Sequence, residues 1–98
     1  MELIPREIKE QIPKLYETED VKDPIVHIKL FLGAWTWYIT EISIDEDICF
    51  GYVISPFGKE LGYFSLDELT SLRGRYGSWI ERDLYFKTTK LSNVRKEN

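Results

Sequence analysis

The amino-acid sequence predicts an α+β protein: an antiparallel meander of four to five strands, with a capped helix packed on one face. Two observations lead to this prediction. Apolar and polar residues alternate with a period of two from residue 25 to residue 64, as in half-buried strands. A segment with helical period and its own capping residues follows directly. A sheet with one apolar face needs such a cover, so the two patterns belong to one fold.

The chain is expected to begin with a short helix and a loop. Pro5 suits the first turn of a helix, where a missing N–H costs nothing. Pro13 ends the helix, because the residue before a proline is disfavoured in the α region. The acidic stretch 17–24 then forms a loop. Isoleucines at four-residue spacing give the helix one apolar face: Ile4, Ile8 and Ile12.

Four strands joined by hairpins are expected to form the sheet. Tight turns separate them at Gly33, at the acidic segment 43–47 and at 56–58. Trp35 and Trp37 share one face of the second strand, and we expect one of them to be largely buried. The four segments with alternating hydrophobicity are 25–32, 34–42, 48–55 and 60–64.

The covering helix is predicted over residues 65–73. Ser65 is the expected N-cap with Glu68 reaching back, and Gly74 stands where a C-terminal capping glycine belongs. Residues 81–88 form either a last strand or an extended segment. The apolar face of the helix consists of leucines at three-residue spacing: Leu66, Leu69 and Leu72.

Charge divides the chain into a body and a tail. The 98 residues include 13 Lys and Arg against 17 Asp and Glu, a net charge of −4, whereas nucleic-acid binders usually lean basic. Residues 1–86, expected to be a single globular domain, hold 16 of these acids. Residues 87–98 are basic and polar, and we expect a flexible tail there; an arm that touches nucleic acid is the alternative.

The sequence offers little catalytic chemistry. One cysteine excludes an internal disulfide, and a single histidine excludes a multi-histidine metal site. Cys49 and His27 could form a dyad, but nothing nearby would activate the thiol, so Cys49 is expected in the core. No phosphate-binding loop, dinucleotide fingerprint, transmembrane run or signal peptide is evident. We therefore expect a cytoplasmic protein that is not an enzyme and needs no cofactor or metal.

Five ordered blocks resemble a bacterial family of unknown function, which is carried mainly on plasmids, phages and similar mobile elements. This resemblance extends over nearly the whole chain and implies no catalytic residues. In at least one branch it implies counter-defence, since some members look like anti-CRISPR proteins that inhibit type II Cas9. The blocks are GAWTWY (33–38), FGYV (50–53), GYFSLDEL (62–69), LRG (72–74) and IERDL (80–84).

The resemblance and the composition together predict a non-enzymatic counter-defence protein. We expect it to inhibit Cas9 by binding the protein or its guide RNA complex directly, as a monomer in the cytoplasm of the bacterial host. The alternative is an accessory module of a mobile element that binds a replication, partition or transfer protein. Contact with a membrane or direct binding of nucleic acid is not expected from an acidic body.

An acidic hairpin turn is the predicted partner-binding surface. Acids outnumber bases across the body, and a hairpin tip can present charge without disturbing the sheet. Arg73 and Arg75 are the second-choice surface, with Trp35 and Trp37 as an alternative aromatic platform. The residues expected to meet a basic surface on the partner are Glu41, Asp45, Glu46 and Asp47.

Overall fold

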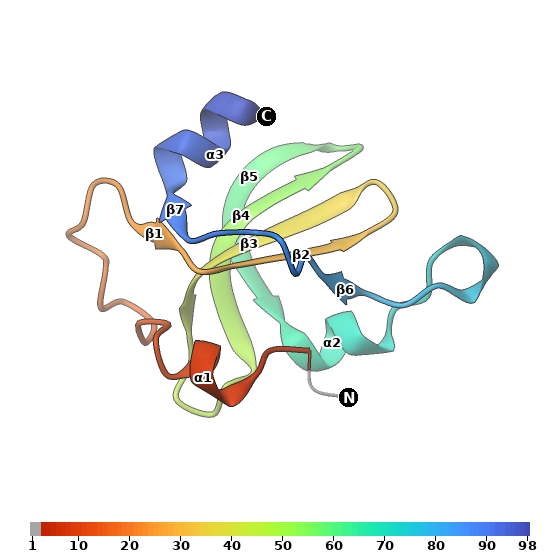
Figure 1. The fold of residues 1–98 in the computed structure, drawn as a ribbon, viewed down its shortest axis with the longest axis horizontal. Helices are drawn as coiled ribbons and strands as arrows, with labels where there is room; N and C mark the ends of the chain where they lie inside the picture. The colour runs from red at the N-terminus through yellow and green to blue at the C-terminus, as the bar shows by residue number, and fades with distance from the viewer. Residues whose placement is uncertain (1–2) are drawn as a thin grey trace.

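A five-stranded antiparallel sheet in the order β5-β4-β3-β2-β6 dominates the computed structural model, which describes residues 3–98 (Figure 1). A second, two-stranded sheet pairs β1 with β7. This architecture confirms the predicted α+β class. The strands are β1 Ile25–Val26, β2 Ile28–Leu32, β3 Trp35–Ile42, β4 Ile48–Ser55, β5 Gly58–Ser65, β6 Glu81–Arg82 and β7 Thr89–Lys90. The helices are α1 Arg6–Lys9, α2 Leu66–Ser71, the 3₁₀ helix η1 Arg75–Gly77 and α3 Leu91–Glu97.

The first face of the sheet carries the larger apolar core. Alternate residues of β2 and β3 point into it, and Trp37 is buried there while Trp35 is exposed, as expected for one of the pair. α2 and the N-terminal segment cover this face. The buried members are Ile4, Ile12, Ile28, Leu30, Leu32, Trp37, Ile39, Ile42, Cys49, Leu66, Leu69 and Ile80.

The predicted cap is present at the N-terminus of α2 but not at its C-terminus. Ser65 caps the N-terminus as predicted, because its side-chain oxygen accepts the backbone N–H of Glu68 at 3.2 Å. The predicted capping role of Gly74 is wrong: the helix ends at Ser71, and Gly74 has an ordinary φ of −84°. A Cβ at Gly74 would meet the side-chain ends of Ser78 and Leu32, the latter at 2.9 Å, so Gly74 lies in a tight place but does not cap the helix.

The second face of the sheet is also apolar, which differs from the expectation of one covered face. Tyr38 and Tyr52 are buried on it, and α3 packs over them through Leu91 and Val94 (Figure 1). The expected flexible tail from residue 87 instead contains β7 and this helix. Its polar composition conceals two apolar residues three positions apart, the spacing of one helical face.

Contacts far apart in sequence fasten this C-terminal segment. Ser92 donates its backbone N–H and its hydroxyl to the carboxylate of Asp23, at 2.9 and 2.6 Å. β7 pairs with β1 immediately beside this contact. Residues 81–88, by contrast, contribute only the short strand β6, after which Leu84 and Tyr85 are exposed.

Leu91→Ala is expected to lower the free energy of unfolding by about 2–3 kcal/mol, because a buried large-to-small change loses apolar contact and leaves a cavity. Lys96→Ala, on the exposed side of the same helix, should change it by less than about 0.5 kcal/mol. Urea unfolding followed by tryptophan fluorescence measures both. Equal effects would show that α3 does not stabilise the sheet.

Gly51 marks a close approach of β3 and β4. A Cβ built at this position would lie 2.8 Å from the carbonyl carbon of Tyr38 and 3.1 Å from the Cα of Ile39. Both atoms belong to the backbone and cannot rotate away. Gly62 pairs directly with Gly51 in β5, and a Cβ there would have nothing within 4 Å.

Gly51→Ala should therefore destabilise the protein by about 3 kcal/mol, the upper end for overpacking, because the strands must separate to admit the methyl group. Gly62→Ala is the matched control and should leave stability nearly unchanged or raise it slightly. Thermal denaturation of the two variants against the wild type measures the difference. A harmless Gly51→Ala would contradict the close approach.

Candidate functional site

The predicted acidic site begins in the turn between β3 and β4. The Ser43 side chain organises this turn by accepting the backbone N–H of Ile48 at 2.9 Å and donating to Asp45. The Ser43 hydroxyl holds the pKa of Asp45 below its ordinary value. Asp45 is exposed, so it remains accessible to a partner.

Glu46 and Asp47 are engaged with other parts of the chain. The guanidinium of Arg6 donates to both carboxylate oxygens of Glu46, which lowers the pKa of that group. Asp47 accepts the Ser65 hydroxyl at 3.0 Å and the backbone N–H of Asp67 at 2.9 Å. Asp47 therefore ties the turn to the N-terminus of α2, where a negative charge is favourable.

The expected place of Glu41 near the hairpin tip is wrong. Its side chain is only 5% exposed, and its carboxylate accepts the backbone N–H groups of Tyr16 and Thr18 at 2.9 and 3.0 Å. The Thr18 hydroxyl donates to it as well. A register shift in β3 between Ile39 and Glu41 places Glu41 opposite Phe50, and the 16–18 segment covers its carboxylate there.

These contacts make the acidic surface less available to a partner than the sequence suggests. All four carboxylates accept hydrogen bonds within the chain, but only those of Glu41, Glu46 and Asp47 join the hairpin to distant segments, where a binding protein would have to compete with contacts that hold the fold together. Binding through the turn stays a prediction, and Asp45 is the residue best placed to contribute to it.

An exposed aromatic surface lies at the opposite end of the sheet. We call it the aromatic end; it brings together the tips of the β2–β3 and β4–β5 hairpins and the loop between α2 and β6 (Figure 1). Phe57 is 90% exposed and Trp79 57% exposed, although both are large apolar side chains. The aromatic end consists of Trp35, Phe57, Leu72, Arg73 and Trp79.

Contacts connect these side chains into one surface. The rings of Trp35 and Phe57 lie 6.3 Å apart, and Trp35 stacks on the buried Trp37 at 5.8 Å. Trp35 of the hairpin and Leu72 and Arg73 of the loop line one open hollow of about 530 Å³, which joins the two parts of this surface. The guanidinium of Arg73 then lies over the ring of Trp79. A partner could therefore contact all three segments at once.

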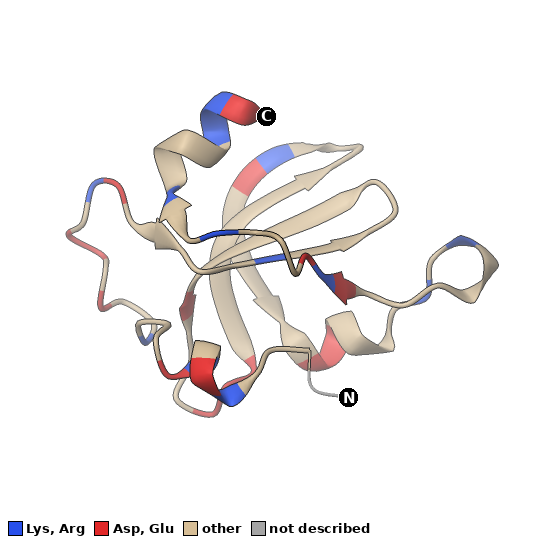
Figure 2. Ribbon diagram, in the orientation of Figure 1, with Lys and Arg blue, Asp and Glu red and all other residues tan. Residues whose placement is uncertain are grey.

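The charge of this end is positive. In Figure 2 the loop between α2 and β6 carries two basic positions and no acidic one. Arg73 donates to the backbone carbonyls of Leu72 and Thr70, at 2.9 and 3.2 Å. Among residues 3–98, neither Arg73 nor Arg75 forms an ion pair. Both second-choice arginines thus lie on or beside the aromatic end.

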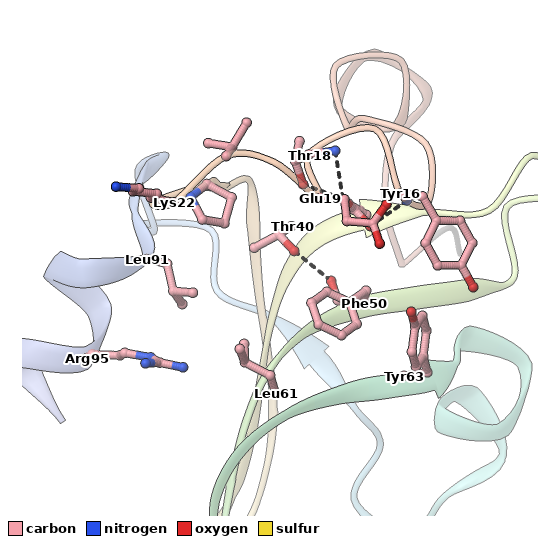
Figure 3. A pocket seen from close by; sticks show the side chains of 13 residues that line it. Tyr16, Thr18, Glu19, Lys22, Thr40, Phe50, Leu61, Tyr63, Leu91 and Arg95 are labelled. Carbon is pink, nitrogen blue, oxygen red and sulfur yellow. Dashed lines mark hydrogen bonds between the residues drawn. The ribbon is translucent and has the colours of Figure 1, made fainter.

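A smaller pocket of about 380 Å³ lies between the 16–24 loop, the second face of the sheet and α3 (Figure 3). Phe50 and Leu61 form its apolar floor, and Arg95 reaches toward it from α3. The Thr40 hydroxyl within it donates to the Phe50 carbonyl at 3.0 Å. The Glu41 carboxylate has its hydrogen-bond partners within the chain, so an apolar floor with the charged Glu19, Lys22 and Arg95 around it characterises this pocket.

The remaining polar candidates belong to the core. Burial raises the pKa of the Cys49 thiol to about 12, so the reactive thiolate is scarce. Burial also lowers the pKa of His27. Among the described residues, no group of three or more His, Cys, Asp or Glu could hold a metal ion. Nor is any helix in residues 3–98 long and apolar enough to cross a membrane.

Sequence reasoning did not select Phe57, Leu72 or Trp79. A signal for two of them existed, because Phe57 lies in a turn between Pro56 and Gly58, and Trp79 follows a short glycine-containing loop. Large aromatic residues in turns have few ways to become buried. Leu72 gave no such signal, since its spacing matches the buried face of α2.

Glu41→Gln tests the structural role of the buried carboxylate. The amide loses the charge and faces the backbone donors with one oxygen instead of two, so the free energy of unfolding should fall by about 2 kcal/mol. Asp45→Asn, in the exposed part of the same turn, should have a much smaller effect. Chemical denaturation compares the two. If both variants change the free energy of unfolding by a similar small amount, Glu41 is a surface residue, as expected from the sequence.

No curated protein and no solved structure matches the chain, so fold and site rest on the geometry above. A family model does match, over residues 3–96, and its description is a protein of unknown function. The match covers all three loops of the aromatic end. The chain belongs to the DUF2958 family of proteins of unknown function.

Proposed function

We propose that the protein is a non-enzymatic inhibitor that binds a partner protein through the aromatic end. The single observation behind this proposal is the connected set of exposed Trp35, Phe57, Leu72 and Trp79 with a stacked Arg73. Single exposed apolar residues are normal on protein surfaces. A connected group from three loops is characteristic of an interaction site.

The residue types favour a protein partner. Tryptophan and arginine are enriched among the residues that contribute most to protein–protein binding. Trp35 stacks on buried Trp37, and Arg73 is held by two backbone carbonyls and the Trp79 ring, so these groups are partly ordered before binding. Such preorganisation lowers the entropy cost of association.

The charge of the aromatic end indicates the chemistry of the partner. Arg73 and Arg75 have no carboxylate partner among residues 3–98, so a complementary surface would be apolar with acidic residues at its rim. This differs from the basic surface expected opposite the acidic turn. The whole chain has a net charge of −4, which disfavours direct contact with a phosphate backbone.

Cas9 is the partner to test first, because the family resemblance implies counter-defence in at least one branch. In this proposal the protein blocks a functional surface of Cas9 without imitating DNA. Binding to a replication, partition or transfer protein of a mobile element is the alternative, and it would use the same end of the molecule.

A titrated Cas9 cleavage assay tests the proposal, with the protein added either to Cas9 alone or to the preformed guide complex. Wild type should inhibit, and Trp79→Ala should weaken inhibition by about 30-fold, as expected for a central aromatic contact. Tyr85→Ala is the matched control, since Tyr85 is an exposed aromatic residue outside the aromatic end.

Two results would count against the proposal. Absence of inhibition in both orders of addition would exclude Cas9 as the partner and leave the alternative. Equal loss in Trp79→Ala and Tyr85→Ala would exclude the aromatic end. An effect of Asp45→Asn alone would assign binding to the acidic turn, as the sequence predicts.

A further inference from the structure

The five-stranded sheet has one edge that is long and open. β5 pairs with β4 at eight successive positions without a register shift, and it contains no proline. The opposite edge is the two-residue strand β6. Natural proteins usually protect an exposed edge with short strands, prolines or bulges. β5 has none of these, its charged residues Lys59 and Glu60 stand together near its start, and no strand of residues 3–98 pairs with its outer side.

Exposed apolar side chains lie along this open edge, in β5. Leu61 is 43% exposed and Tyr63 55% exposed, and both point to the face of the sheet that carries α3. They border the pocket of Figure 3, where Tyr63 packs against Phe50 with ring centres 4.8 Å apart. An added strand would therefore gain both backbone hydrogen bonds and apolar contact.

We propose that β5 pairs in antiparallel fashion with β5 of a second copy of this chain, about a two-fold axis at Gly62. The two five-stranded sheets would then form one continuous sheet. In this register Leu61 lies directly opposite Tyr63 of the second copy, and the contact occurs twice. Gly62 carries no side chain, so nothing from this position has to be packed above or below the sheet at the axis.

The sequence of β5 is complementary to itself in this register. Lys59 falls opposite Ser65 and Glu60 opposite Phe64, so no like charges face each other across the new pair of strands. A register centred on Leu61 instead places Lys59 opposite Tyr63 and Glu60 opposite Gly62, and buries less apolar surface. A closed two-fold contact of this kind uses the edge on both copies and stops at the dimer. It replaces the monomer expected from sequence.

Sedimentation velocity of the full chain over a concentration series tests the dimer. Wild type should show a reversible monomer–dimer equilibrium. The double variant Leu61→Lys with Tyr63→Lys brings like charges together twice. It should raise the dissociation constant of the dimer at least about tenfold. The matched control is Leu84→Lys with Tyr85→Lys, which changes two exposed apolar residues away from β5 and should leave the equilibrium unchanged.

A charge exchange tests the register. Lys59→Ser with Leu61→Lys and Tyr63→Glu in one chain places the lysine at position 61 opposite the glutamate at position 63 twice in the proposed register, so this variant should still form the dimer. In the register centred on Leu61 the same variant places two lysines together, has no lysine at position 59 opposite the glutamate, and should be monomeric. Thermal denaturation of each variant shows that the fold is retained.

A wild type that stays monomeric at its highest soluble concentration would overturn the proposal and leave the edge to an extended segment of another protein. Equal weakening in the β5 variant and its control would overturn it as well. This inference does not rest on the proposed function. Trp79→Ala should keep the dimer, and the β5 variant should keep its inhibition at the aromatic end, so the two proposals can fail separately.

Discussion

The structure depends on one constraint: both faces of a small antiparallel sheet are apolar, and a chain of 98 residues must cover both. One cover comes from α2 and the N-terminal segment, and the other from α3. Because each helix is short, packing rather than intrinsic helix stability holds it in place. Buried or bridging carboxylates fasten the covers, with Glu41 holding the 16–18 segment and Asp23 holding the start of α3.

The same constraint explains where the surface stays apolar. Covers built from helices of four to seven residues reach the middle of the sheet but not its rim. The hairpin tips carry the exposed Trp35 and Phe57, and the outer strand carries Leu61 and Tyr63, which border the 16–24 loop and α3 but stay exposed. Both proposed contacts therefore occur at margins that residues 3–98 cover only in part.

The strands and α2 could be predicted because their patterns are local. Period-two alternation fixes the strands, and Ser65 with Glu68 fixes the start of α2. α3 was missed because Leu91 and Val94 are only two apolar residues in a basic segment, and their partners Tyr38 and Tyr52 are distant in sequence. Glu41 was misplaced for a similar reason, since the Tyr16 and Thr18 groups that cover its carboxylate are more than 20 residues away in the sequence.

The hydrogen bonds of the carboxylates also distinguish two roles of an acidic residue that the sequence alone could not tell apart: its long-range charge and its direct contact with a partner. An acid that accepts hydrogen bonds within the chain still contributes its charge to the field far from the molecule, but it has little capacity left for a direct contact. Long-range fields mainly set association rates and their salt dependence, whereas buried anchors set dissociation. In the proposed complex, the acidic body would govern how fast a charged partner approaches. The aromatic end, where Trp79 and Phe57 are exposed, would govern how long that complex lasts.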